Sequence, residues 1–155
     1  MKRMPLNMGR NPEKIAKEHT HMNKILNTTK APAAIGPYSQ GVQCGNMVFV
    51  SGQLPFVPET GALLEGTVGE MTVQSMKNIE AILAEAGCTL ADVVKTTIFL
   101  KDLNDFAEVN AAYATFFPQN PPARACVQVA KLPRDAKVEI EAIASASVPL
   151  DPARD

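Results

Sequence analysis

Two segments with helical periodicity alternate with short β-branched segments along this chain, and no other sequence feature limits the fold as strongly. Thr67 and Glu70 form a capping-box pattern, after which apolar or small side chains recur every three or four residues until Gly87. A second helix is predicted over residues 104–117, where Pro118 ends it. Because only two helices are available to cover the predicted strands, the pattern predicts an α+β domain.

Apolar, β-branched runs predict the strands. One strand follows the turn signal at residues 35–37, and the others are predicted at residues 46–52, 92–100, 124–130 and 137–145. Residues 54–66 contain two prolines and two glycines and are predicted to form a loop. The predicted order is β-β-α-β-α-β-β, a mixed sheet with both helices on one face.

The two helices leave the other face of the sheet uncovered. We expect that face to mix apolar and polar groups, with Cys126 and Gln128 beside Arg124. A mixed face favours contact with another copy of the chain over exposure to water. The sequence therefore predicts a homo-oligomer with clefts between its subunits.

Charge divides the chain into two parts. Residues 1–30 carry seven Lys and Arg against two Glu, whereas residues 31–155 carry eight Lys and Arg against fourteen Asp and Glu. The first part has little apolar content and no clear period. We therefore expect residues 1–24 to be a mobile basic extension, residues 25–148 to form the folded domain, and residues 149–155 to be a C-terminal tail. Met22 is an alternative start of the chain.

Several classes of function are disfavoured by residue content. Both histidines, His19 and His21, precede the predicted domain, which therefore contains no Ser-His-Asp triad, Cys-His dyad or imidazole metal site. Three widely spaced cysteines without a CxxC pattern argue against a disulfide framework or a zinc ribbon, and they fit a reducing compartment. No apolar run approaches the roughly 18 residues of a membrane span. We expect a cytoplasmic protein.

Catalysis without histidine would depend on other polar groups. Arg124 begins a strand after two prolines, and its guanidinium suits a carboxylate held by two hydrogen bonds; the alternative is a surface ion pair. Asn110 falls inside the apolar stripe of the second helix, so its amide should bond a loop backbone or a ligand site. Glu139 and Glu141 share one face of a strand. Either that strand is a solvated edge of the sheet, or one of the two carboxylates activates a water molecule. We interpret Cys126 as a small buried residue and not as a nucleophile.

Five stretches carry a family resemblance when they are read together: APAAIGPYSQGV (31–42), SGQ (51–53), KTTIFLKDLNDFAEVNAAY (95–113), PARACVQVA (122–130) and LPRDAKVEIEAIA (132–144). They occur in family order and span nearly all of residues 25–147. The chain resembles the RidA/YjgF family of reactive-intermediate imine deaminases, also called the L-PSP endoribonuclease family.

The resemblance implies a fold and an activity. The fold would be that of small chorismate mutases: a homotrimer whose sheets form an inner barrel, with helices outside and three clefts between subunits. The activity would be hydrolysis of 2-imino acids such as 2-iminopropanoate and 2-iminobutanoate, and of enamines such as 2-aminoacrylate, to 2-keto acids and ammonia. Pyridoxal-phosphate dehydratases release these enamines. The family itself uses no metal and no organic cofactor.

The resemblance also implies roles for individual residues. The arginine that binds the substrate carboxylate falls on Arg124, and the glutamate that orients the attacking water falls on Glu139. Backbone groups near Gly36 and Cys126 would assist that glutamate. The remaining substrate-binding positions of the family fall on Tyr38, Ser51, Asn110 and Cys126. Pro121 stands where many members carry an aromatic residue, which alters one wall of the expected pocket.

Two alternative functions follow from the same resemblance. Some relatives are described as endoribonucleases that inhibit translation, but the acidic balance of residues 31–155 and the absence of Trp disfavour a nucleic-acid partner. A non-catalytic ligand-binding or chaperone-like protein could use the same clefts. The presence of both Arg124 and Glu139 argues against that reading, because other branches of the superfamily lack the arginine.

Overall fold

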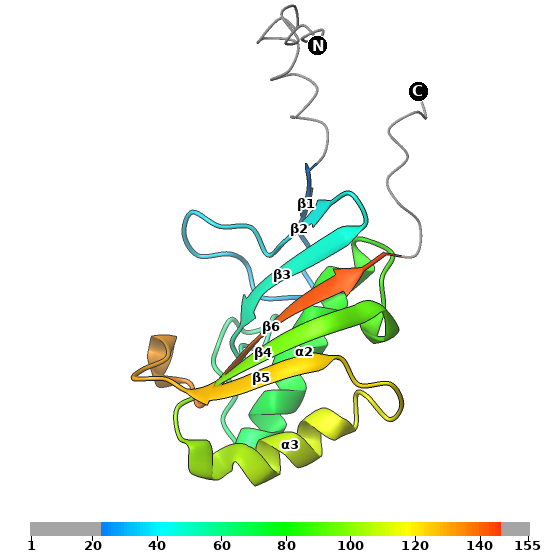
Figure 1. The fold of residues 1–155 in the computed structure, drawn as a ribbon. Helices are drawn as coiled ribbons and strands as arrows, with labels where there is room; N and C mark the ends of the chain where they lie inside the picture. Colours follow the sequence, from blue (N-terminus) through cyan, green and yellow to red (C-terminus); the bar gives the residue numbers. More distant parts are fainter. Residues whose placement is uncertain (1–22, 147–155) are drawn as a thin grey trace, which may run out of the picture.

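The computed structural model describes residues 23–146, and within them six strands form one sheet (Figure 1). In sheet order the strands are β1 (Asn23–Leu26), β2 (Gly41–Cys44), β3 (Met47–Gln53), β6 (Val138–Ser145), β4 (Val93–Leu100) and β5 (Ala123–Gln128). The two α-helices are α2 (Val68–Ala84) and α3 (Phe106–Ala114). The predicted α+β fold with a mixed sheet is confirmed, and β1 is one strand more than the sequence predicts.

The last strand, β6, lies in the middle of the sheet and pairs with β3 on one side and β4 on the other. Because β6 is antiparallel to both, β3 and β4 run in the same direction, as β4 and β5 do. Helices α2 and α3 connect these parallel strands. The first crossover leads from β3 to β4, and the second leads onward from β4 to β5. Because both crossovers are right-handed and advance in the same direction across the sheet, both helices lie on the same face, as predicted.

Helix α2 begins as its sequence predicts. The Thr67 side chain accepts a hydrogen bond from the Glu70 amide at 3.2 Å, and the Glu70 carboxylate accepts one from the Thr67 amide at 2.8 Å. The helix then buries one face against the sheet, where the fully buried side chains include Met76, Ile79, Ile82, Leu83, Ile98 and Ile140. Past the helix end, Gly87 adopts a φ of 68°, which its missing side chain allows.

Helix α3 is shorter than predicted. Residues Leu103–Asp105 form a 3-10 turn before it, and the amide of Phe117 bonds three residues back, which is the tighter pattern of a helix end. The predicted apolar stripe also differs from the observed packing. Val109 and Tyr113 are buried, but Phe106 is 39% exposed and Asn110 is exposed.

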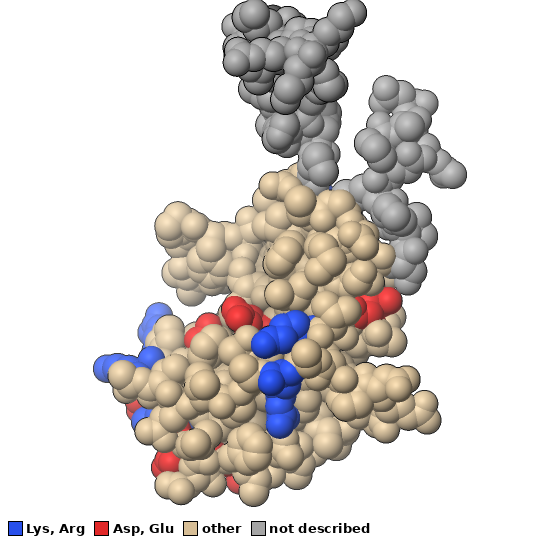
Figure 2. Space-filling model, in the orientation of Figure 1, with Lys and Arg blue, Asp and Glu red and all other residues tan. Residues whose placement is uncertain are grey.

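The face of the sheet away from the helices is uncovered, and it is mixed in character. Phe49 and Val127 are each 44% exposed, and Figure 2 shows few charged residues on the side of the molecule that it draws. The prediction that Arg124, Cys126 and Gln128 lie on this face is wrong. Arg124 pairs with the buried Thr96 and so points to the helix side, and Cys126 and Gln128 share its direction.

The ends of the predicted domain differ slightly from the observed elements. Asn23 and Lys24, which the sequence assigns to the basic extension, are the first residues of β1. The rest of that extension and the C-terminal tail lie outside the described residues. Within residues 23–146, no helix has the length and apolar character needed to cross a membrane.

Candidate active site

Arg124 is held on the helix side of edge strand β5 by three residues of α3. One guanidinium nitrogen donates a hydrogen bond to the Asn110 side-chain oxygen at 2.7 Å. The guanidinium carbon lies 5.0 Å from the centre of the Tyr113 ring and 5.7 Å from that of Phe106. Both distances fall within the range of a cation–π contact. The sequence predicts either a loop backbone or a ligand site as the partner of the Asn110 amide. The structure shows a residue of the candidate site, Arg124, as that partner.

The position of Tyr113 is itself fixed. Its hydroxyl lies 2.7 Å from the hydroxyl of Thr96, and both side chains are buried. Burial raises the pKa of Tyr113, so the ring stays neutral beside the guanidinium. Two buried residues on different elements therefore support one face of Arg124.

A hollow of about 440 Å³ opens beside Arg124. Its walls include Asn110, Tyr113, Phe117, Pro121 and Pro122, so Pro121 does form part of this wall. Among the described residues, no carboxylate lies within ion-pair distance of Arg124, which removes the surface ion pair as its explanation. We call this hollow the arginine half-site, because it presents a cation that could bind an anion from outside the chain.

Glu139 lies on the opposite, uncovered face of the sheet. It lines a hollow of about 600 Å³ together with Tyr38, Ser51, Gly52 and Glu141. Burial raises the pKa of Glu139, and the nearby charge of Glu141 raises it further. A carboxylate with a raised pKa is a stronger base. We call this hollow the glutamate half-site.

Gly52 provides the space that Glu139 occupies. A side-chain carbon at this glycine would collide with the carboxylate of Glu139. The missing side chain at this glycine therefore allows the close approach of Glu139. The alternative that Glu139 and Glu141 lie on a solvated edge is wrong, because β6 is a central strand.

The backbone before β2 shapes the other wall of the glutamate half-site. Gly36 adopts a φ of 123°, and its carbonyl accepts a hydrogen bond from the Tyr38 amide at 2.9 Å. The hydroxyl of Ser51 donates to the Ser39 carbonyl at 2.6 Å, and the Ser51 amide donates to the Gln40 carbonyl at 3.0 Å. These bonds tie the loop that carries Tyr38 to the end of β3.

Within one copy of the chain, the two half-sites lie far apart. Along β4, Arg124 pairs opposite Thr96 and Glu139 pairs opposite Phe99. The two residues are therefore offset by roughly 10 Å along the strands and by two strand spacings, also roughly 10 Å, across them. They also point to opposite faces of the sheet. One small substrate could contact both residues only between two copies of the chain.

Two features complete the local chemistry. Cys126 follows Arg124 on the same side of β5, and burial raises the pKa of its thiol although the charge of Arg124 opposes this. That direction fits an unreactive cysteine. Within residues 23–146, no three His, Cys, Asp or Glu side chains are grouped to hold a metal ion.

Comparison with known proteins identifies the family of the chain. The model of the family described as endoribonuclease L-PSP matches residues 28–146. The chain belongs to this family. The family is the one that the sequence resembles, and its model spans every strand from β2 to β6 and both α-helices.

Relatives within the L-PSP family carry different names. The 2-iminobutanoate/2-iminopropanoate deaminase of Salmonella typhimurium is 56% identical over 126 residues, which cover 79% of this chain and 98% of that protein. A RutC family protein of Pyrococcus abyssi is 51% identical over 121 residues, covering 78% of this chain and 95% of that protein. The solved structure of Escherichia coli TdcF with bound serine has a TM-score of 0.77 at 50% identity, covering 80% of this chain and 99% of that one.

The structure groups most of the positions that the L-PSP family resemblance implies. Tyr38, Ser51 and Glu139 line one half-site, and Asn110 and Arg124 line the other. Sequence reasoning missed the role of Phe106 and Tyr113 as supports for Arg124. Their spacing of four and three residues around Asn110 was the available signal, since these positions share one side of a helix.

Proposed function

We propose that this protein hydrolyses small 2-imino acids, such as 2-iminopropanoate and 2-iminobutanoate, to 2-keto acids and ammonia. The observation that carries the proposal is the pair of half-sites: an arginine without a carboxylate partner among the described residues, and a half-buried glutamate with a raised pKa. The name of the 56% identical relative from Salmonella supports the same chemistry.

The proposed reaction needs only the substrate and water. The iminium carbon beside a carboxylate is electrophilic, and Arg124 holds that carboxylate through two N–H donors. Glu139 accepts a proton from water as the water oxygen bonds to the iminium carbon. Glu139 then returns this proton to the nitrogen of the carbinolamine, and the carbon–nitrogen bond breaks as the hydroxyl oxygen forms the carbonyl. The hydroxyl proton leaves with ammonia as ammonium, so Glu139 ends as the carboxylate. Tyr38, Ser51 and the backbone near Gly36 and Cys126 would position the substrate and water.

The proposed site lies between subunits of a homotrimer. The uncovered sheet face supports self-association, because it exposes Phe49 and Val127 beside polar groups. The opposite orientation of Arg124 and Glu139 supports a site shared by two copies. Light scattering of the full chain should give the mass of three copies; a monomer at assay concentration that retains full activity would contradict the shared site.

A coupled assay tests the proposed reaction. A pyridoxal-phosphate dehydratase acting on serine or threonine generates the 2-imino acid in the cuvette, and the release of keto acid is followed over time. We expect the protein to accelerate release beyond the spontaneous rate of a matched sample without it. Folded, oligomeric protein that leaves the spontaneous rate unchanged would refute the proposed activity.

The pH dependence of kcat/KM should report Glu139. Because the base form is lost when the carboxylate is protonated, activity should fall as the pH drops through a pKa above the usual range of glutamate. Replacing Glu141 with glutamine removes one cause of that raised pKa. The acidic limb should therefore move to lower pH, so that Glu141→Gln retains a larger fraction of its maximal activity in acid than the wild type does. A limb that stays fixed, or moves to higher pH, would contradict this electrostatic coupling.

Phe106 should contribute to substrate binding through Arg124. An exposed cation–π contact contributes about 0.5–1 kcal/mol, so Phe106→Leu should raise KM by roughly two- to fivefold while kcat changes less. Phe116→Leu is the control for lost packing, because Phe116 packs against the hydrophobic core and no stacking of its ring on Arg124 is seen. Equal effects of the two substitutions would point to a general loss of packing instead.

A further inference from the structure

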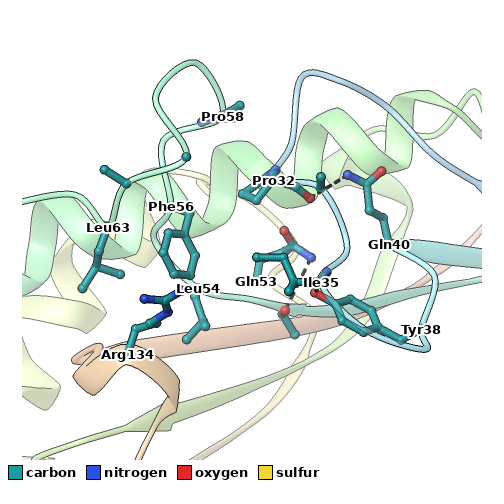
Figure 3. Close-up of a pocket in the computed structure, with 14 residues that line it drawn as sticks. Pro32, Ile35, Tyr38, Gln40, Gln53, Leu54, Phe56, Pro58, Leu63 and Arg134 are labelled. Atoms are coloured by element: carbon teal, nitrogen blue, oxygen red, sulfur yellow. Dashed lines mark hydrogen bonds between the residues drawn. The ribbon is translucent and has the colours of Figure 1, made fainter.

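A third hollow, of about 530 Å³, lies beside the glutamate half-site (Figure 3). Two loops form most of it, the segment before β2 and the loop between β3 and α2, and the end of β3 and Arg134 complete it. Apolar side chains make up much of its lining, including Pro32, Ile35, Leu54, Phe56 and Leu63. We call this hollow the apolar pocket. Its volume falls within the range of about 300–1,000 Å³ that is typical of small-molecule sites.

Buried amide side chains hold both loops in place. Gln40, which is 2% exposed, donates to the Pro32 carbonyl at 2.7 Å and accepts from the Thr28 amide at 2.7 Å. Figure 3 shows the bond between Gln40 and Pro32 at one wall of the pocket. This wall is therefore fixed by hydrogen bonds that water cannot easily replace.

The opposite wall is fixed in the same way from α2. Asn78 is 1% exposed, and its amide nitrogen donates to the carbonyls of Leu54 at 3.2 Å and Phe56 at 2.9 Å. Because two buried amides on separate elements anchor the two walls, the apolar pocket exists before any ligand enters it. A preformed apolar pocket binds apolar groups without the cost of ordering its loops.

The apolar pocket is continuous with the glutamate half-site. Both hollows are lined by Ile35, Tyr38, Gly52, Leu54 and Phe56. Resting on the proposed function, the imino carbon would lie near Glu139, and the side chain of the substrate would then lie next to these shared residues. A methyl or ethyl group would fill only a small part of the space beyond them.

We propose that the apolar pocket binds the side chain of the 2-imino acid and that its rim, at Ala62 and Leu63, sets the size limit for that side chain. The ligand class is the 2-imino acid with an uncharged, branched aliphatic or aromatic side chain. Arg134 also lines the pocket and makes no ion pair among the described residues, so a positively charged side chain would be repelled.

The test narrows the pocket without altering the half-sites. Ala62 is exposed and lines the pocket, so Ala62→Phe reduces its width at the rim. Glu59→Phe is the matched control, because Glu59 is exposed on the same loop and lines none of the three hollows described above. An amino-acid oxidase supplies the imines of alanine and leucine, and kcat/KM is compared for each variant and the wild type.

We expect Ala62→Phe to lower kcat/KM for the leucine imine by about tenfold or more, since misfit in an apolar pocket has effects of that size. The alanine imine should change by less than about threefold, and Glu59→Phe should resemble the wild type with both substrates. Equal loss with both imines in Ala62→Phe, or no loss with either, would overturn the proposal for the pocket while leaving the proposed activity intact.

A binding measurement separates this inference from the proposed function. Calorimetry measures the affinity of the protein for pyruvate and 4-methyl-2-oxopentanoate, the keto acids of the two imines. It therefore tests binding in the pocket without turnover. Tighter binding of the larger keto acid, lost in Ala62→Phe, would support the pocket even if no imine is hydrolysed. Equal affinity for the two keto acids in the wild type would overturn it.

Discussion

Replacing Arg124 with alanine should reduce kcat/KM for a 2-imino acid by about 2–5 kcal/mol of transition-state stabilisation, which is roughly a 30- to 5,000-fold loss. The expected size of this loss follows from the arrangement of the arginine half-site. Asn110 and the rings of Phe106 and Tyr113 hold the guanidinium in place, so a bound carboxylate receives an oriented pair of donors. The measurement is the coupled assay with wild-type and variant protein at matched concentrations.

Two controls separate this effect from misfolding. Arg124 is exposed on an edge strand, so circular dichroism and light scattering of Arg124→Ala should match the wild type. Arg124→Lys keeps the charge but loses the planar pair of donors, and it should recover only part of the lost activity. An Arg124→Ala protein that is folded, oligomeric and nearly fully active would refute the role of this residue.

Replacing Glu139 with glutamine should lower kcat by about 10²- to 10⁴-fold, the usual contribution of a general base. Glutamine has nearly the same shape, so the space beside Gly52 stays filled and the substrate should still bind. Binding of a keto-acid product by calorimetry should therefore change little. The loss should appear in kcat and not in affinity.

Glu141 provides the matched comparison for this substitution. It lies on the same face of the same strand and lines the same hollow, so Glu141→Gln removes a similar charge from nearby. We expect Glu141→Gln to retain most of its kcat at neutral pH. Equal kcat losses in the two variants would mean that net charge on this face, and not Glu139 itself, supports the reaction.

The sequence predicted those helices and strands that depend on interactions between residues close together in the chain. The capping box at Thr67 and Glu70 predicted the start of α2, and Gly87 predicted its end within a few residues. The β-branched runs predicted β3, β4, β5 and β6. Arg124 and Glu139 stood out because a histidine-free domain has few groups for acid–base or anion chemistry, and the family resemblance then gave them roles.

The parts that could not be predicted depend on pairing between distant segments. Nothing in the sequence of β6 shows that it inserts between β3 and β4, and that insertion turns Glu139 from an edge residue into a central one. The direction of Arg124 also depends on the register of β5 against β4. The exposure of Phe106 follows from packing on an edge strand, since helical periodicity alone predicts burial.

The central claim is that Arg124 of one copy and Glu139 of another act on the same substrate, and mixing two inactive variants tests it most directly. Arg124→Ala and Glu139→Gln are co-expressed with different tags, and mixed oligomers are isolated through both tags. In each mixed oligomer of the proposed trimer, one of the three clefts contains both groups, because only one cleft joins an intact Arg124 to an intact Glu139. We predict that the mixed oligomers regain activity far above that of either variant alone. Mixed oligomers that stay as inactive as both parents would contradict a site shared between copies.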